Sequence, residues 1–223
     1  YRDELLELFA GLDTYTTSKR QSPKDGIEDR MLKNILLELI AIDDSAASHT
    51  LILDHFKAAT TATDRIAALL ALNRSSAPQR RTLIEEVYLK WHMHLSGYAN
   101  YLRVVAGGTR EDVFEMIETE KNRPGFDIRQ PTWSRALFMS MAANNKMVWT
   151  SQGIRWVADT VIELAPINAI TSGRLLNTFQ HVNSLKPRLQ ECVRAELERI
   201  ARSVSRTECP TVHGQASAYL EGS

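Results

Sequence analysis

Apolar residues recur at the spacing of an α-helix almost from end to end of this 223-residue chain. Alternating apolar and polar runs, which half-buried strands require, are few. In the clearest segment, predicted to be a helix over about residues 27–43, apolar residues are spaced to share one side while the other side is charged: Met31, Leu32, Ile35, Leu36, Leu39 and Ile40. The period therefore predicts an all-α protein.

Capping and stop signals divide this pattern into separate helices. Thr63 is interpreted as the cap of a helix through Leu72, and Ser76 with Gln79 three residues later is interpreted as a capping box. The pair Gly107-Gly108 is expected to end a helix by adopting left-handed conformations. Other helices are predicted over about residues 46–59, 97–106, 132–143, 153–164, 168–181, 187–203 and 208–220.

The connections between these helices are short, so consecutive helices must pack antiparallel. Stacking such pairs predicts an armadillo/HEAT-like superhelix, which we expect to form a single helical-repeat domain over residues 1–223. Residues 13–26, rich in Thr, Ser, Lys and Asp, are the one long polar stretch and are predicted to be a flexible loop. The start at Tyr1, without Met and inside an amphipathic pattern, indicates a segment of a larger protein.

Composition argues against several classes of partner. Lys plus Arg and Asp plus Glu each total 27, and the basic residues form no long run, so we expect no nucleic-acid partner. The four tryptophans are interpreted as interhelical packing rather than base stacking. No apolar run approaches the roughly 18 residues of a membrane span, so no membrane partner is expected. Two cysteines without paired spacing indicate free thiols and a cytoplasmic location.

No complete catalytic site is visible in the chain. A zinc hydrolase helix needs His-Glu-x-x-His, but the nearest cluster is Trp91-His92-Met93-His94, whose histidines are two apart and point in different directions on a helix. No serine lies in a Gly-x-Ser-x-Gly elbow. Cys192 lies on the apolar helical stripe of Leu189, Val193, Leu197 and Ile200 and is interpreted as a small buried residue. We therefore predict no catalytic residue, no metal ligand and no cofactor in this segment.

From about Arg30 onward, several segments occur in an order that resembles the C-terminal helical domain of the aminopeptidase N (alanyl aminopeptidase) family of zinc metallopeptidases, in its bacterial, plant and protozoan branch. These segments are RMLKNILL at 30–37, TATDRIAAL at 61–69, FDIRQP at 126–131 with RAL at 135–137, ANN at 143–145, Asn168 with Arg174-Leu175, and RAELERI at 194–200. Each alone is a cap or packing pattern. Six of them in order over about 190 residues carry the resemblance.

The resemblance implies a parent enzyme that removes N-terminal amino acids from peptides, with zinc in an upstream catalytic domain. That domain would be this segment's partner, together with the peptide substrate. The family's terminal domain closes over the catalytic domain and encloses the substrate chamber, so this segment is expected to form a wall that gates access. It would begin after the first helices of the family's domain, and residues 13–26 would be an insertion.

Three substrate-channel residues follow from the same resemblance. The helix that begins near Asn168 would face the active site, and Arg174 matches an arginine that approaches the far side of the bound peptide. Ile170 stands where bacterial relatives carry a polar side chain, which implies a more apolar subsite. The alternative is a stand-alone helical scaffold that grips a protein or peptide in its concave groove. An initiator Met directly before Tyr1 would favour that alternative.

Overall fold

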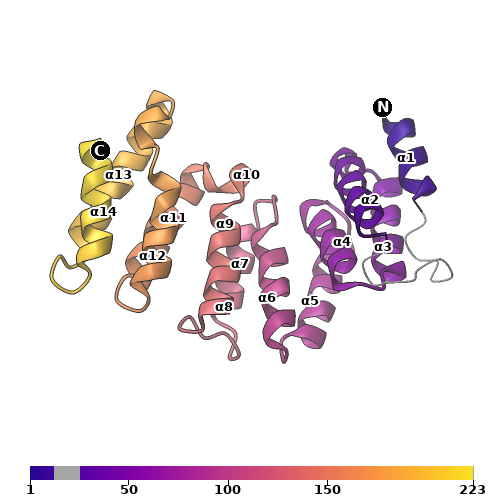
Figure 1. Cartoon of the computed structure of the whole chain (residues 1–223), viewed down its shortest axis with the longest axis horizontal. Coiled ribbons are helices and arrows are strands. Elements are labelled where there is room, and N and C mark those ends of the chain that lie inside the picture. Colours follow the sequence, from indigo (N-terminus) through magenta and orange to yellow (C-terminus); the bar gives the residue numbers. More distant parts are fainter. Residues whose placement is uncertain (13–25, 223) are drawn as a thin grey trace. The chain divides into compact units, whose positions relative to one another are not determined.

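The computed structural model describes residues 1–12 and 26–222 (Figure 1). These ranges contain helices and the turns between them, and no strand, which confirms the predicted all-α class. Backbone contacts divide the chain into two compact units, Tyr1–Arg110 and Glu111–Ser223. The single domain over residues 1–223 stays a prediction. The predicted loop at residues 13–26 lies outside the described residues except for Gly26, the residue before α2.

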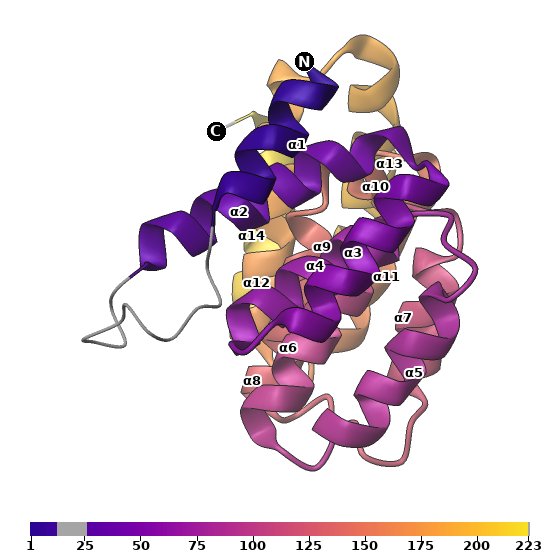
Figure 2. The same cartoon turned by 90° about the vertical axis from the view of Figure 1, so that its right-hand side faces the viewer.

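The first unit stacks helices in the manner of a repeat protein. It contains α1 (Arg2–Gly11), α2 (Ile27–Ile40), the 3₁₀ turn η2 (Ala41–Asp43), α3 (Ala46–Ala58), α4 (Ala62–Arg74), α5 (Arg80–Trp91) and α6 (Leu95–Ala106). Helix α3 packs on α4 and α5 packs on α6, while α2, α4 and α6 contact one another in series. Figure 2 shows α3 and α4 side by side. Contacts to the next helix and to the next but one are typical of stacked helix pairs.

A buried polar chain joins α2, α3 and α4 beside the apolar core of this unit. The Nε2 atom of His55 lies 3.0 Å from the side-chain oxygen of Asn34, whose amide nitrogen donates to Asp64 at 2.9 Å. Burial lowers the pKa of His55, because a charged imidazole would lose its hydration there. His55 and Asp64 are buried, so these hydrogen bonds hold α2, α3 and α4 in one register.

The outer side of α2 differs from the prediction. Leu36 and Ile40 are buried, but Met31, Leu32, Ile35 and Leu39 are exposed. The buried side of α2 also takes Leu37 and the stem of Lys33, whose ammonium donates to the Leu12 carbonyl at 2.7 Å. The physical reason is that apolar residues occupy a wider arc of α2 than its neighbours α1, α3 and α4 cover.

Two predicted caps are placed differently in the structure. The cap of α4 is Thr61 rather than Thr63, and its hydroxyl accepts from the Asp64 backbone nitrogen at 3.2 Å. The predicted box at Ser76 does not form, because α5 begins at Arg80 and the Ser76 backbone nitrogen donates to Asp44 at 2.6 Å. Long-range contacts therefore override the local capping signal at Ser76.

Gly107 and Gly108 do not adopt the left-handed conformation predicted for them. Among the described residues the glycines with positive φ are Gly26 and Gly222, and Gly107 has a φ of −82°. Side chains of α4 approach both glycines closely instead. A Cβ on Gly107 would lie 2.6 Å from Leu70, and one on Gly108 would lie 2.7 Å from the amide nitrogen of Asn73.

The second unit begins with α7 (Val113–Lys121) and continues through several short helical pieces. These are α8 (Pro131–Ser134), the π-helical turn η3 (Arg135–Met139), α9 (Ser140–Ala142) and α10 (Asn145–Val148). The first three follow without a break, so the helix predicted over 132–143 contains one widened turn.

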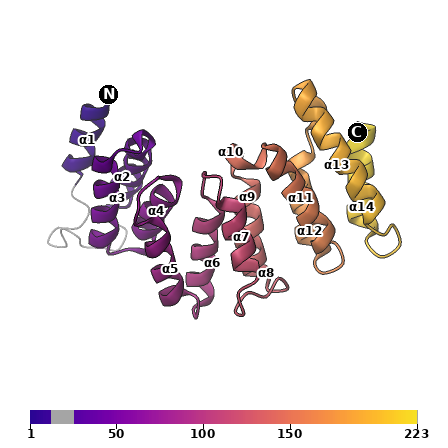
Figure 3. The ribbon, with the colours of Figure 1, turned by 180° about the vertical axis from the view of Figure 1, so that it is seen from behind.

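The C-terminal helices of this unit are α11 (Ser151–Leu164), α12 (Ala169–Leu176), the 3₁₀ turns η4 (Asn177–Phe179) and η5 (Val182–Ser184), α13 (Pro187–Ser203) and α14 (Pro210–Glu221). Helix α11 contacts α12 and α13, and α14 contacts α12 and α13 (Figure 3). The predicted helix over 168–181 is too long, because α12 ends at Leu176 and the tighter turn after it places Phe179 in the core. The helix predicted over 187–203 is confirmed.

Candidate functional site

Helix α12 carries the three residues expected at a substrate channel. Its orientation is set by its buried side, where the Ser172 hydroxyl donates to the Val161 carbonyl of α11 at 2.8 Å. The other buried side chains of α12 are Thr171, Leu175 and Leu176. With this side fixed against α11, the opposite side of α12 is exposed.

Asn168 is the N-cap of α12. Its side-chain oxygen accepts from the Thr171 backbone nitrogen at 3.0 Å, and its own backbone nitrogen donates to the Leu164 carbonyl at 2.7 Å. A capping side chain satisfies one of the free N–H groups at a helix start. Asn168 therefore has a structural role, because its capping hydrogen bond fixes the first turn of α12.

Ile170 and Arg174 share the exposed side of α12, one helical turn apart. Ile170 is 72% exposed, and Ile167 in the preceding turn is 41% exposed. Arg174 is also exposed, and within the described residues no hydrogen bond or ion pair engages its guanidinium. The surface of α12 therefore combines an apolar patch with a cation whose donors are available to a carboxylate or a carbonyl.

The C-terminal end of α12 is held by α14. The Gln215 side-chain amide donates to the Gly173 carbonyl at 3.1 Å, and the Tyr219 hydroxyl donates to the side-chain oxygen of Asn177 at 2.8 Å. These positions were not predicted from the sequence. They lie about 40 residues from α12 along the chain, and no local pattern marks such a pairing. The hydrogen bonds from Gln215 and Tyr219 hold the end of α12 that carries Arg174 in a fixed position.

Of the two histidines considered as metal ligands in the sequence, His92 and His94, the first has a packing role. The ring of His92 stacks on Tyr88 with a centroid distance of 4.8 Å, and its Nδ1 lies 2.9 Å from the Tyr88 carbonyl. In the described part of the chain, no three His, Cys, Asp or Glu side chains gather as metal ligands would. The residues present there do not form a zinc site. Both cysteines are free thiols; Cys209 is buried, whereas Cys192 is partly exposed rather than buried as predicted.

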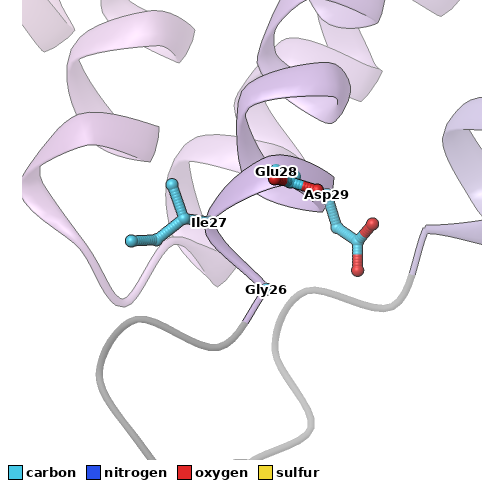
Figure 4. Close-up of a pocket in the computed structure, with 4 residues that line it drawn as sticks. All are labelled: Gly26, Ile27, Glu28 and Asp29. Carbon is cyan, nitrogen blue, oxygen red and sulfur yellow. The ribbon is translucent and has the colours of Figure 1, made fainter.

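A hollow at the start of α2 carries no recognisable chemistry. It is lined by Gly26, Ile27, Glu28 and Asp29. Figure 4 shows the side chains of Ile27 and Asp29 pointing to different sides of the helix, so the groups do not converge on a common point. A binding site for a small molecule needs convergent polar groups in an enclosed pocket.

The comparisons with known proteins fit this helical architecture. Residues 1–207 match the family model described as "Domain of unknown function (DUF3458_C) ARM repeats". The chain belongs to this family. This match confirms the helical-repeat class, and together with the relatives described next it confirms the resemblance to the C-terminal domain of the aminopeptidase N family. No described helix is long and apolar enough to cross a membrane.

Similar proteins include two bacterial aminopeptidases N. The one from Caulobacter vibrioides is 26% identical over 174 residues, which are 77% of this chain and 20% of that protein. The one from Escherichia coli is 24% identical over 201 residues, or 89% of this chain and 23% of that protein. The chain thus spans about a fifth to a quarter of the length of these relatives.

A solved structure shares the fold. Legionella pneumophila aminopeptidase A, crystallised in complex with aspartic acid, superimposes with a TM-score of 0.85 at 19% identity. The superposition covers 100% of this chain and 27% of that one. The complete chain therefore has its counterpart within one part of a larger aminopeptidase structure.

Proposed function

We propose that this chain is the C-terminal helical part of a zinc aminopeptidase that removes N-terminal amino acids from peptides, and that it forms one wall of the substrate chamber. In this proposal the catalytic domain lies elsewhere in the parent polypeptide and supplies the zinc, which would polarise the scissile carbonyl and activate water. This chain contributes shape and electrostatics, gates access to the chamber and performs no chemical step.

The observation that carries the proposal is the exposed side of α12. Ile170 and Ile167 offer an apolar surface, and Arg174 offers a guanidinium without a partner among the described residues. An arginine fork binds carboxylates and carbonyls through paired donors, so it suits the backbone or C-terminus of a peptide. Asn168 supports this surface indirectly, because it caps the helix that presents it.

We expect Arg174→Ala in the full-length enzyme to lower kcat/KM for peptides of several residues by about tenfold, equivalent to about 1.4 kcal/mol of lost interaction. A minimal aminoacyl reporter should be affected less than twofold, since it does not extend from the zinc to α12. Steady-state kinetics on both substrates measure the difference. Arg174→Lys keeps the charge but loses the fork, so it should recover only part of the activity on peptides.

Arg206→Ala is the matched control. Arg206 is exposed in the turn between α13 and α14 and, unlike Arg174, does not lie on α12. Its replacement should leave both substrates unchanged. Equal losses on the long peptide and the minimal reporter for Arg174→Ala would contradict the wall proposal, because an interaction remote from the zinc can affect only substrates long enough to reach it.

A further inference from the structure

Asn177 continues the exposed side of α12 beyond Arg174. It is the C-cap of α12 and the first residue of η4, and its backbone is still helical, with φ −58° and ψ −17°. Ile170, Arg174 and Asn177 are spaced four and three residues apart, so they follow one another along the same side of the helix, and all three are exposed. A neutral polar side chain therefore lies one turn beyond the arginine, at the end of α12 that contacts α14.

Hydrogen bonds with α14 determine which way the Asn177 amide faces. The Gly173 carbonyl can only accept, so the Gln215 side chain must present its amide nitrogen there, at 3.1 Å. The same Gln215 nitrogen donates to the Asn177 side chain, which must therefore present its oxygen. The Tyr219 hydroxyl accepts from Gln215 at 2.8 Å and donates to the Asn177 oxygen at 2.8 Å. The Asn177 oxygen is thus turned toward α14.

This arrangement leaves the Asn177 amide nitrogen as a donor on the exposed side of α12. Nitrogen and oxygen are on opposite branches of a planar amide, so the nitrogen faces away from Gln215 and Tyr219. The described residues give this nitrogen no acceptor, whereas the oxygen beside it has two donors. An amide that is already held in place loses little side-chain freedom when a ligand binds, so the donor is preorganised.

The charges in this stretch of the sequence favour an electronegative ligand. No Asp or Glu occurs between Glu163 and Glu191, whereas Arg174, Lys186 and Arg188 lie within the same stretch. Neither α12 nor the turns after it therefore supply a carboxylate that could neutralise the Arg174 guanidinium. Peptide oxygens, whether of a backbone carbonyl or of a C-terminal carboxylate, accept hydrogen bonds from a guanidinium and from an amide alike.

We propose that Asn177 is a second substrate-binding residue of α12, and that its amide nitrogen and the Arg174 guanidinium together bind oxygen atoms of a peptide. These oxygens belong to a backbone carbonyl or to the C-terminal carboxylate, which share the same acceptor chemistry. Gln215 and Tyr219 are positioning residues, because they act through the orientation of Asn177. The inference rests on the proposed function in taking a peptide substrate as the molecule that meets α12.

Asn177→Ala in the full-length enzyme tests this proposal. We expect kcat/KM for a peptide of several residues to fall about three- to tenfold more than kcat/KM for a minimal aminoacyl reporter, because the lost donor serves only substrates that reach α12. The ratio of the two values does not depend on how much of the enzyme is folded. Asn177→Asp replaces the donor with a carboxylate near Arg174, so it should lower the ratio further.

Gln180→Ala is the matched control, since Gln180 is an exposed amide at the end of η4, three residues after Asn177. It should leave the ratio of the two substrates unchanged. An unchanged ratio in Asn177→Ala overturns the proposal. If Arg174→Ala still discriminates between the peptide and the reporter in that case, the wall proposal stands without a role for Asn177. Equal losses in Arg174→Ala would instead count against the wall proposal itself.

Tyr219→Phe tests the positioning role. Loss of the hydroxyl removes one of the two donors that hold the Asn177 oxygen, so the ratio should fall, but by less than in Asn177→Ala. In the Asn177→Ala background the same substitution should have no further effect on the ratio, and a further loss there overturns the positioning role.

Peptides with free and amidated C-termini distinguish the two sources of oxygen. A loss in Asn177→Ala that is confined to the free acid supports binding of the carboxylate. Equal losses on both peptides support binding of a backbone carbonyl. The absence of a selective loss on either peptide overturns the proposal.

Discussion

At the scale of single residues, the α4–α6 contact shows how one side chain limits the size of its neighbour. The amide nitrogen of Asn73 donates to the Val104 carbonyl at 2.7 Å, and its oxygen accepts from Arg80 at 2.8 Å. Both side chains are buried, and Gly108 lies directly against the Asn73 amide. An unsatisfied buried group costs about 1–3 kcal/mol, so this arrangement tolerates little displacement.

We expect Gly108→Ala to lower the free energy of unfolding by about 1–3 kcal/mol, because the new Cβ would displace Asn73 from its hydrogen bonds. Urea unfolding followed by circular dichroism measures the change. Gly125→Ala is the matched control, since a Cβ there would meet no atom within 4 Å, and it should be near neutral. A similar stability for the two variants would show that Asn73 has room to move.

The sequence showed that Gly107 and Gly108 end a helix, but it predicted the wrong reason for glycine. Left-handed conformations and lack of space both select glycine, and they leave the same residue in the sequence. The distinction depends on Leu70 and Asn73, which come from a helix more than 30 residues away. At the candidate site, Arg174 and Ile170 follow only from a resemblance, and their supports Gln215 and Tyr219 have no local signal at all.

At the scale of elements, helix boundaries depend on which of several capping residues is used. Thr61 and Thr63 both precede the apolar run of α4, and the sequence pattern alone favoured Thr63. The structure selects Thr61, which places Asp64 three residues later so that the Thr61 hydroxyl also donates to its carboxylate at 2.8 Å. Asp64 in turn accepts from Asn34 of α2, so a tertiary contact determines where α4 begins.

Thr61→Ala is expected to destabilise the protein by about 0.5–2 kcal/mol, through loss of the α4 cap. Thr63→Ala, on the exposed first turn of the same helix, should change stability by less than about 0.5 kcal/mol. Thermal or urea unfolding of the two variants compares them in the same background. A larger loss for Thr63→Ala would mean that the cap is at the position expected from the sequence.

At the scale of the whole chain, the helical period was sufficient to predict the all-α class and most helices. It did not show which apolar sides are covered, because the period of α2 is the same whether a neighbour packs on it or not. The exposed Met31 and Ile35 therefore emerged only from the structure. In stacked helix pairs each pair buries its apolar side against the next, but the sequence of one helix does not record which neighbour is present.

The 223-residue chain on its own is expected to bind no stoichiometric zinc and to release no amino acid from an aminoacyl reporter. The physical reason is that zinc needs several convergent ligands, and the described residues hold no group of three from His, Cys, Asp and Glu. His92 is already stacked on Tyr88 and bonded to its carbonyl. Metal analysis after dialysis and a reporter assay test this, with the full-length parent as the active control. Zinc-dependent hydrolysis by the isolated chain would contradict the proposal that this segment forms a chamber wall and performs no chemical step.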